Sequence, residues 1–383
     1  MTRFAAVPAV AVAAVIVLAT SGGAVGAGRA ARPPAAPISA STTTPTGSSV
    51  IFAMGHLHDQ ENTFWELFVR PAGKEAWVLQ TPPGVASNGG LVLAASPSGS
   101  LMVGFMISEL LKFSPVAKSS DGGADWSPGE LPSALTSAPD ALAVGSTGDV
   151  LALVSPGGQR VLESPGDLAT WRTLTTTRAL TRAASSCGVH SVTAVAYNLA
   201  AQPVLGLSCT RPGEVGILTG IGTSTWHDIG LSLGSGATSV TRLVSTADGV
   251  AGLAQVQSGT RASVVGFWGY GTTAHWTGSA TLSIPAGWSV KATATGGGSG
   301  QGLAVLLGSG DTRRVEVVAG PGASWVTLPP APKGASGVSD VGTEVDTFVV
   351  ASSDLAVWAW SEDAADWSHT ASITVPVPYS SSS

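Results

Sequence analysis

Seven tryptophans recur along this chain at similar intervals, each after a short run of small, turn-forming residues. The gaps between them are 49, 45, 55, 50, 49 and 42 residues, and the series is Trp77, Trp126, Trp171, Trp226, Trp276, Trp325 and Trp367. A period in the forties is typical of four-stranded β-propeller blades. The alternative without a repeat is a set of unrelated core aromatic residues.

A second marker keeps the same register. Turns at Ser98-Gly99, Thr147-Gly148 and Asp248-Gly249 end 27, 23 and 27 residues before the next tryptophan of the series. Each unit then consists of strand, turn, strand, loop, strand, small-residue turn and a last strand beginning near the tryptophan. In the third unit these strands are expected at residues 140–145, 150–155, 160–164 and 171–175. The sequence predicts an all-β fold, a single β-propeller of seven four-stranded blades, with six or eight as alternatives.

The turn before Trp126 carries a recognisable motif. Ser119, Asp121, Gly123 and Trp126 match the pattern Ser-x-Asp-x-Gly-x-Thr-Trp, while Asp125 stands at the Thr position. The aspartate can accept backbone N–H bonds, glycine allows positive φ, and the tryptophan buries a large ring between sheets. The motif resembles the Asp-box of sialidase-type (BNR) repeats, of which the chain would be a divergent member. The resemblance implies a structural box at the outer rim of a propeller; the class includes sialidase-like domains and exported propellers that assist photosystem assembly.

The N-terminus predicts export. Residues 1–27 combine Arg3, an apolar segment and the small-residue site Val25-Gly26-Ala27, as a cleaved signal peptide does. An uncleaved anchor is the alternative, although the apolar run is short for a span of about 20 residues. Residues 28–46, rich in Ala, Pro, Ser and Thr, predict a disordered stalk before a propeller at 47–378 and a disordered tail at 379–383. The protein is expected to be secreted, with surface anchoring as an alternative.

The first blade is the hardest to complete. Its inner strand would have to come from the polar segment 39–44, inside the predicted stalk. The segment Ile373–Val377 more simply completes the outer strand of the last blade, so closure through the stalk is left open.

Cys187 and Cys209 are the two cysteines of the chain. In the predicted register they lie at facing ends of a hairpin that turns near Asn198, which permits a disulfide. Two free buried thiols are the alternative. Such a bridge would brace one blade and has no catalytic implication.

The charge balance narrows the class of partner. With 18 basic and 24 acidic residues the net charge is −6, and charged residues make up 11% of the chain. A nucleic-acid-binding face requires clustered basic residues, so no nucleic-acid partner is expected. No cofactor motif is found. The partner is expected to be a protein or a glycan, the chain a monomer, and membrane contact is expected only with an uncleaved signal segment.

The sialidase resemblance requires a test for catalytic residues. Sialidases use a tyrosine nucleophile with a glutamate partner, but Tyr270 and Tyr379 fall in a peripheral turn and the tail, and Tyr197 falls in the hairpin around Asn198. None is expected to point into the central channel. A glycoside hydrolase or a carbohydrate lyase would need converging carboxylates, for which the inner-strand candidates are Asp140, Asp340 and Glu344.

Two further residue pairs could bind a ligand. His56 and His58 would share one face of a strand and make a weak metal-site candidate, but without a placed third ligand a polar loop is the simpler interpretation. Trp358 and Trp360 also share a face. They would form a ligand-stacking surface if exposed, although packing between blades is more usual for tryptophan pairs.

The sequence therefore predicts an exported, non-enzymatic propeller that serves as a binding or assembly scaffold, with ligand contact at the channel mouth and the loops joining blades. The alternatives are a sialidase-like glycoside hydrolase or carbohydrate lyase, and a cell-surface structural protein held by an uncleaved N-terminal helix.

Overall fold

The computed structural model describes most of the chain after residue 37. The chain divides into two units after Pro34, and every described residue belongs to the second, Ala35–Ser383. The described ranges are 38–44, 46–56, 63–82, 91–105, 115–128, 135, 137–155, 158–184, 186–221, 225–232, 236–271, 276–296, 302–341, 344–351 and 354–374.

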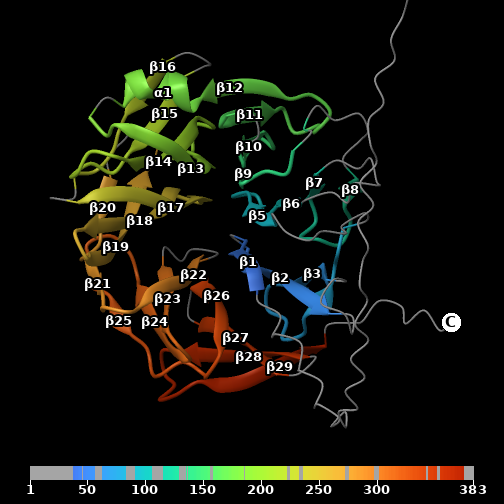
Figure 1. Cartoon of the computed structure of the whole chain (residues 1–383). Helices are drawn as coiled ribbons and strands as arrows, with labels where there is room; N and C mark the ends of the chain where they lie inside the picture. Colours follow the sequence, from blue (N-terminus) through green and yellow to red (C-terminus); the bar gives the residue numbers. More distant parts are fainter. Residues whose placement is uncertain are drawn as a thin grey trace, which may run out of the picture. The chain divides into compact units, whose positions relative to one another are not determined.

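The described part is nearly all β-strand, and its strands pair antiparallel in chain order (Figure 1). Three four-stranded sheets come first: β1 (Ile38–Thr43), β2 (Ser49–His56), β3 (Thr63–Arg70) and β4 (Val78–Leu79); β5 (Val92–Ala95), β6 (Leu101–Gly104), β7 (Val116–Ser119) and β8 (Ser127–Pro128); β9 (Ala141–Val144), β10 (Val150–Val154), β11 (Arg160–Ser164) and β12 (Arg172–Thr176). The two last sheets are β22 (Ser289–Thr295), β23 (Leu303–Ser309), β24 (Thr312–Val318) and β25 (Val326–Thr327); and β26 (Ala335–Val341), β27 (Glu344–Ala351), β28 (Asp354–Ser361) and β29 (Ser368–Thr374).

A larger sheet of nine strands lies between these groups in the sequence. It contains β13 (Val189–Tyr197), β14 (Pro203–Cys209), β15 (Ile217–Ile221), β16 (Thr225–Asp228), β17 (Ala237–Thr246), β18 (Gly249–Ser258), β19 (Arg261–Tyr270), β20 (Trp276–Gly278) and β21 (Leu282–Ile284). A single residue pair, Ser208 with Ser239, joins β14 to β17. Either side of that pair, β13–β16 and β17–β20 each repeat the four-stranded pattern of the other sheets.

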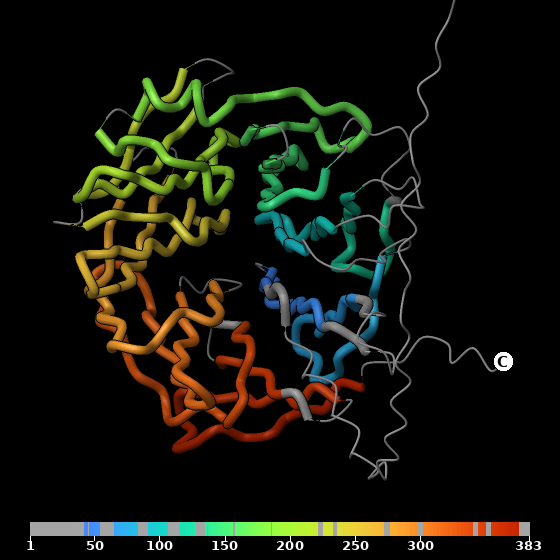
Figure 2. The backbone as a smooth tube through the Cα atoms, viewed as in Figure 1, coloured from blue at the N-terminus to red at the C-terminus, as the bar shows by residue number. Residues whose placement is uncertain are grey.

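The first strands of the repeating groups are neighbours within the second unit. β1 contacts β5, β5 contacts β9, β9 contacts β13 and β13 contacts β17. At the other end of the chain β22 contacts β26, and β26 returns to β1, so the first and last sheets lie side by side (Figure 2). These first strands, called the inner strands below, therefore bring distant parts of the sequence close together.

Hydrophobic clusters fill the spaces between consecutive sheets, and each tryptophan of the repeat contacts a different cluster. Trp126 packs between the first and second sheets, and Trp77 packs with Phe348 between the last and the first. The others, in chain order, are Trp171, Trp226, Trp276, Trp325 and Trp367. Each lies directly before the last strand of its four-stranded group or within its first two residues. The rings therefore act as spacers between sheets.

One tight turn recurs between the first and second strands of several groups. Gly47, Gly99 and Gly148 have φ angles of 90°, 89° and 92°, and each donates its N–H to the carbonyl three residues earlier. Glycine reaches this left-handed region without steric cost. Ala201 takes the same place in the β13–β14 turn, with φ of 54° and a bond to the carbonyl of Asn198.

Two features of the fold correct the sequence analysis. β1 lies inside the range 28–46, which was predicted to be a disordered stalk. The first sheet takes its inner strand from that segment, which is the closure through the stalk that the sequence analysis left open. A short helix, α1 (Thr177–Ala183), was not predicted; Thr176 caps it by accepting the N–H of Ala179, and Leu180 is buried. No helix among the described residues is long and apolar enough to cross a membrane.

Candidate functional site

Five of the inner strands, β1, β5, β9, β13 and β17, line a cavity of about 240 Å³, called the central cavity below. Its walls also include the residues directly before β5 and β9, and they consist mainly of small, β-branched and hydroxyl side chains such as Thr42, Ala94 and Thr193. Such a lining offers hydrogen-bonding groups and apolar surface without dense charge. This cavity is formed by first strands of five groups, whereas ligand contact was expected at the channel mouth and the loops joining blades.

Two charged residues, Asp140 and Arg242, belong to the described lining. Asp140 lies directly before β9; its backbone N–H donates to Leu153 and its carboxylate accepts the hydroxyl of Ser155. Arg242, on β17, donates from Nη1 to the carbonyl oxygen of Thr293 on β22 at 3.0 Å. Burial lowers the pKa of Arg242 to about 10, so this side chain is still a cation at neutral pH.

The other predicted acids do not join Asp140 in the described part of this cavity. Asp340 lies in β26, but its side chain is outside the described residues. Glu344 begins β27, the second strand of its sheet, and is exposed rather than on an inner strand. The prediction of Glu344 as an inner-strand residue was therefore wrong, because β26 supplies that strand.

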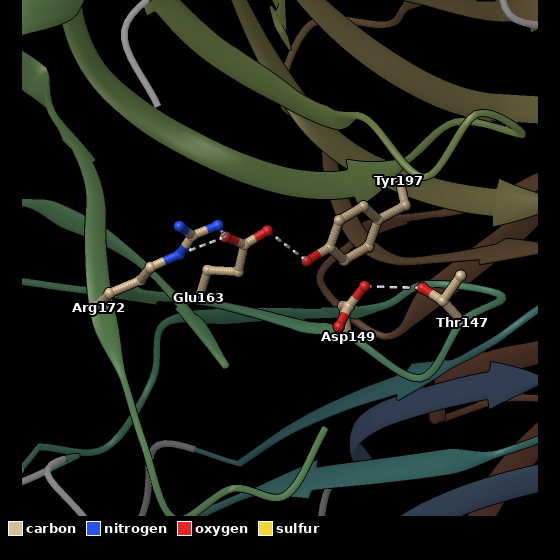
Figure 3. A network of polar contacts seen from close by, with 5 residues as sticks. All are labelled: Thr147, Asp149, Glu163, Arg172 and Tyr197. Carbon is tan, nitrogen blue, oxygen red and sulfur yellow. Dashed lines mark hydrogen bonds and ion pairs between the residues drawn. The ribbon is translucent and has the colours of Figure 1, made fainter. Parts of the chain in front are cut away.

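Tyr197 was expected in a hairpin but is the last residue of the inner strand β13. Its ring is 2% exposed, and its hydroxyl donates to Oε1 of Glu163 at 3.3 Å (Figure 3). Burial, followed by the nearby carboxylates of Glu163 and Asp149, raises the pKa of the Tyr197 phenol. The tyrosine–glutamate proximity could not be found from sequence spacing, since it joins two different sheets.

The turn of residues 119–126 is held by its own side chains. Ser119 Oγ accepts the N–H of Gly123 at 2.7 Å, and Asp121 accepts the N–H of Asp125 at 3.0 and 3.1 Å. The hydrogen bond from Asp125, then that from Ser119, lowers the pKa of Asp121. The carboxylate of Asp121 therefore favours its charged form while it holds the turn together.

The turn before Trp171 has similar bonding that the sequence motif did not show. Ser164 Oγ accepts the N–H of Leu168 at 3.2 Å, as Ser119 does from Gly123. Asp167, one residue later than the motif position, accepts the N–H groups of Ala169 and Thr170. Leu168 has φ of 59° where Gly123 has 101°. The missing glycine and the shifted aspartate hid this turn from a pattern search.

Cys187 and Cys209 form a disulfide bond, with Cα atoms 5.0 Å apart. Cys209 ends β14, while Cys187 lies two residues before β13. Both are buried in the cluster between the third sheet and β13–β16. The bridge therefore lies in a core between sheets, away from the lining of the central cavity.

The remaining predicted binding residues do not form an open site in the described part. Trp358 and Trp360 are half-buried and pack against the cluster between the last two sheets, where Trp358 meets His369 edge-on at 5.5 Å. His56 ends β2, but its side chain and the whole of His58 lie outside the described residues. Within those residues no group of three or more His, Cys, Asp or Glu side chains could hold a metal ion.

Comparisons with solved structures support a β-propeller fold. No family model matches the chain, and no curated protein matches it. A solved prolyl endopeptidase structure is 12% identical with a TM-score of 0.51, covering 90% of this chain and 50% of that one. A Bacteroides uniformis protein described as a candidate 6-phosphogluconolactonase is 11% identical with a TM-score of 0.50, covering 86% and 96%. YCF48 from Cyanidioschyzon merolae is 14% identical with a TM-score of 0.45, covering 82% and 93%.

Proposed function

We propose that this chain, whose β-propeller fold its structural neighbours support, is an exported, non-enzymatic propeller of seven blades that acts as a binding scaffold for a glycan or protein partner at the mouth of the central cavity. Fold alone does not give function, so the proposal depends on the site.

The seven-blade count is supported by the clusters between sheets. Each of the seven described clusters joins two consecutive four-stranded groups, counting β13–β16 and β17–β20 as separate groups. The last of them joins the final group to the first through Phe348, Ile51 and Phe68. Membership of the Asp-box class is supported by the matching bonds of Ser119 and Ser164 in two successive units.

The composition of the central cavity carries the proposed binding role. Acid–base cleavage of a glycosidic bond uses two carboxyl groups about 5–10 Å apart. The described lining instead offers Asp140, the cation Arg242 and several hydroxyl and apolar groups, a mixture typical of recognition. Tyr197 is buried and does not belong to the described lining of this cavity, which argues against a tyrosine nucleophile there.

Export is supported by the disulfide, since such bonds persist in oxidising compartments. The proposed secretion therefore rests on this disulfide together with the N-terminal sequence.

The experiment is a binding screen of the purified protein on a glycan array, with a panel of fluorogenic glycosides assayed in parallel. A Thr241→Trp variant places a large ring on an exposed position that lines the cavity. Thr277→Trp, on an exposed position of the outer strand β20, is the matched control. We expect binding without turnover, lost in Thr241→Trp and kept in Thr277→Trp. Turnover of any glycoside would contradict the non-enzymatic role, and equal binding by both variants would contradict the central site.

A further inference from the structure

A second cavity, of about 370 Å³, lies outside the central one. It is lined by Asp149 from the β9–β10 turn, Glu163 from the end of β11, and Trp171 and Arg172 at the start of β12, with Pro165 and Thr170 beside them. None of these residues lines the central cavity. The volume is within the range of about 300–1,000 Å³ that small-molecule sites occupy.

The polar walls of this cavity are held in place before any ligand arrives (Figure 3). Glu163 and Arg172 are register partners on β11 and β12, and the guanidinium donates from Nε to Oε2 of Glu163 at 2.9 Å. The other oxygen of Glu163 accepts the buried hydroxyl of Tyr197. Asp149 accepts the hydroxyl of Thr147 at 2.8 Å. Fixed groups lose little freedom on binding, which favours affinity.

The aromatic wall is fixed as well. The indole N–H of Trp171 donates to the carbonyl oxygen of Leu168 at 3.0 Å, and the ring is half-buried rather than fully covered. Leu168 is itself positioned by the Ser164–Asp167 turn. The turn therefore fixes the residue to whose carbonyl oxygen the indole is bound.

These groups together define a ligand chemistry. An aromatic ring packs against the apolar C–H face of a pyranose, while carboxylates accept from hydroxyl groups and a guanidinium donates to them. Asp149 and Glu163 carry two negative charges against one positive charge on Arg172, so the cavity disfavours an anionic ligand. We propose that this cavity is a binding site for an uncharged pyranose unit of a carbohydrate, separate from the central site of the proposed function.

The test measures binding of methyl glycosides of glucose, galactose, mannose, xylose and N-acetylglucosamine, with glucuronic acid as the anionic comparison. Saturation-transfer NMR detects contact, and indole fluorescence gives the dissociation constant. Two variants remove the charge of a wall group: Arg172→Gln, which also shortens the side chain, and the isosteric Asp149→Asn. Lys333→Gln is the matched control, because it removes one positive charge from the exposed ion pair with Asp311. Thermal unfolding followed by circular dichroism confirms that each variant is folded.

We expect at least one neutral glycoside to bind, with a dissociation constant about tenfold higher in each wall variant and unchanged in Lys333→Gln, as loss of one charged hydrogen bond predicts. Glucuronic acid should bind more weakly than the neutral sugars. Absence of binding by every neutral glycoside at millimolar concentration would overturn the proposal. So would unchanged affinity in both wall variants. Loss of binding in Thr241→Trp but not in Arg172→Gln would place the sugar in the central cavity and overturn this second site.

Discussion

At the residue scale, Glu66 is the clearest departure from the apolar interior. It is 7% exposed on β3, between the core residues Trp65 and Leu67, and its Oε2 atom has no hydrogen-bond partner among the residues that the structure describes. Because strand residues alternate between faces, Glu66 points with Phe68 toward the cluster between the last and first sheets. Burial raises the pKa of Glu66 from 4.5 to about 7.

This shift predicts a pH-dependent stability. Between the unfolded pKa of 4.5 and the folded value of about 7, the folded chain keeps a proton that the unfolded chain releases. The free energy of unfolding contributed by Glu66 is therefore fully present below pH 4.5 and falls as the pH rises to 7, by up to about 1.4 kcal/mol per pH unit. Urea unfolding across this range should show a steeper loss of stability in the wild type than in Glu66→Gln. Parallel curves for the two proteins would show that Glu66 ionises normally.

At the element scale, the repeated turns between first and second strands contain an internal comparison. Gly47, Gly99 and Gly148 occupy a left-handed position that Ala201 occupies in the β13–β14 turn. The side chain of Asn198 supports that turn by accepting the N–H groups of Ala200 and Gln202, both at 2.9 Å. Ser96 holds the glycine-containing β5–β6 turn in the same way, by accepting the N–H of Ser100 at 2.9 Å, so the two turns differ mainly in the residue at the left-handed position.

Opposite substitutions at this position should change stability in opposite directions. Ala201→Gly relieves the strain of a Cβ atom at φ of 54° and should stabilise the protein by about 0.5 kcal/mol, after the greater entropy of glycine in the unfolded chain is subtracted. Gly99→Ala should destabilise the protein by about 1 kcal/mol. The added Cβ would lie 3.7 Å from the nearest atom and causes no clash, so the expected cause is strain of the left-handed backbone. Chemical denaturation measures both, and a change of the same sign in the two variants would refute strain as the cause.

Strand positions were predictable where the signals are local. In the third sheet, β9–β12 begin and end within one residue of the expected ranges, because glycine turns bound short apolar runs there. The helix α1 was missed because seven residues with one buried position, Leu180, give little helical periodicity. A turn before Trp171 was expected, but its similarity to the turn of residues 119–126 was missed because its hydrogen bonds form without the residues of the motif.

At the scale of the whole molecule, the contact between the first and last sheets is the most distant in sequence. Arg70 on β3 forms an ion pair with Asp346 on β27, with Nη2 and Oδ2 2.6 Å apart and the Asp346 side chain fully buried. The guanidinium also lies over the ring of Trp77, 5.3 Å from its centroid. One arginine therefore links the first and last sheets through its ion pair with Asp346, while its contact with Trp77 lies within the first group.

Removing the Arg70 charge should weaken this junction strongly. Arg70→Met keeps the alkyl chain but leaves the buried carboxylate of Asp346 without its guanidinium, which costs about 3 kcal/mol. The control is Lys333→Met, whose pair with Asp311 is exposed and should contribute less than about 1 kcal/mol. Denaturant unfolding compares them, and Arg70→Met/Asp346→Asn should recover part of the loss. Equal, small effects in Arg70→Met and Lys333→Met would show that the ion pair does not hold the junction.

The sequence by itself determined what depends on neighbouring residues: the repeat of tryptophan and turn, the nearly all-β content and the position of Cys187 and Cys209 at facing ends of one hairpin. The tertiary structure alone decided which units meet. Tyr197 donates a hydrogen bond to Glu163, and Arg70 pairs with Asp346. β1, formed by residues predicted to be a disordered stalk, completes the first sheet. The physical reason is that turns and strands are set by short-range sterics and hydrogen bonds, whereas contacts between sheets depend on how every unit packs against the next, and no single segment encodes that packing.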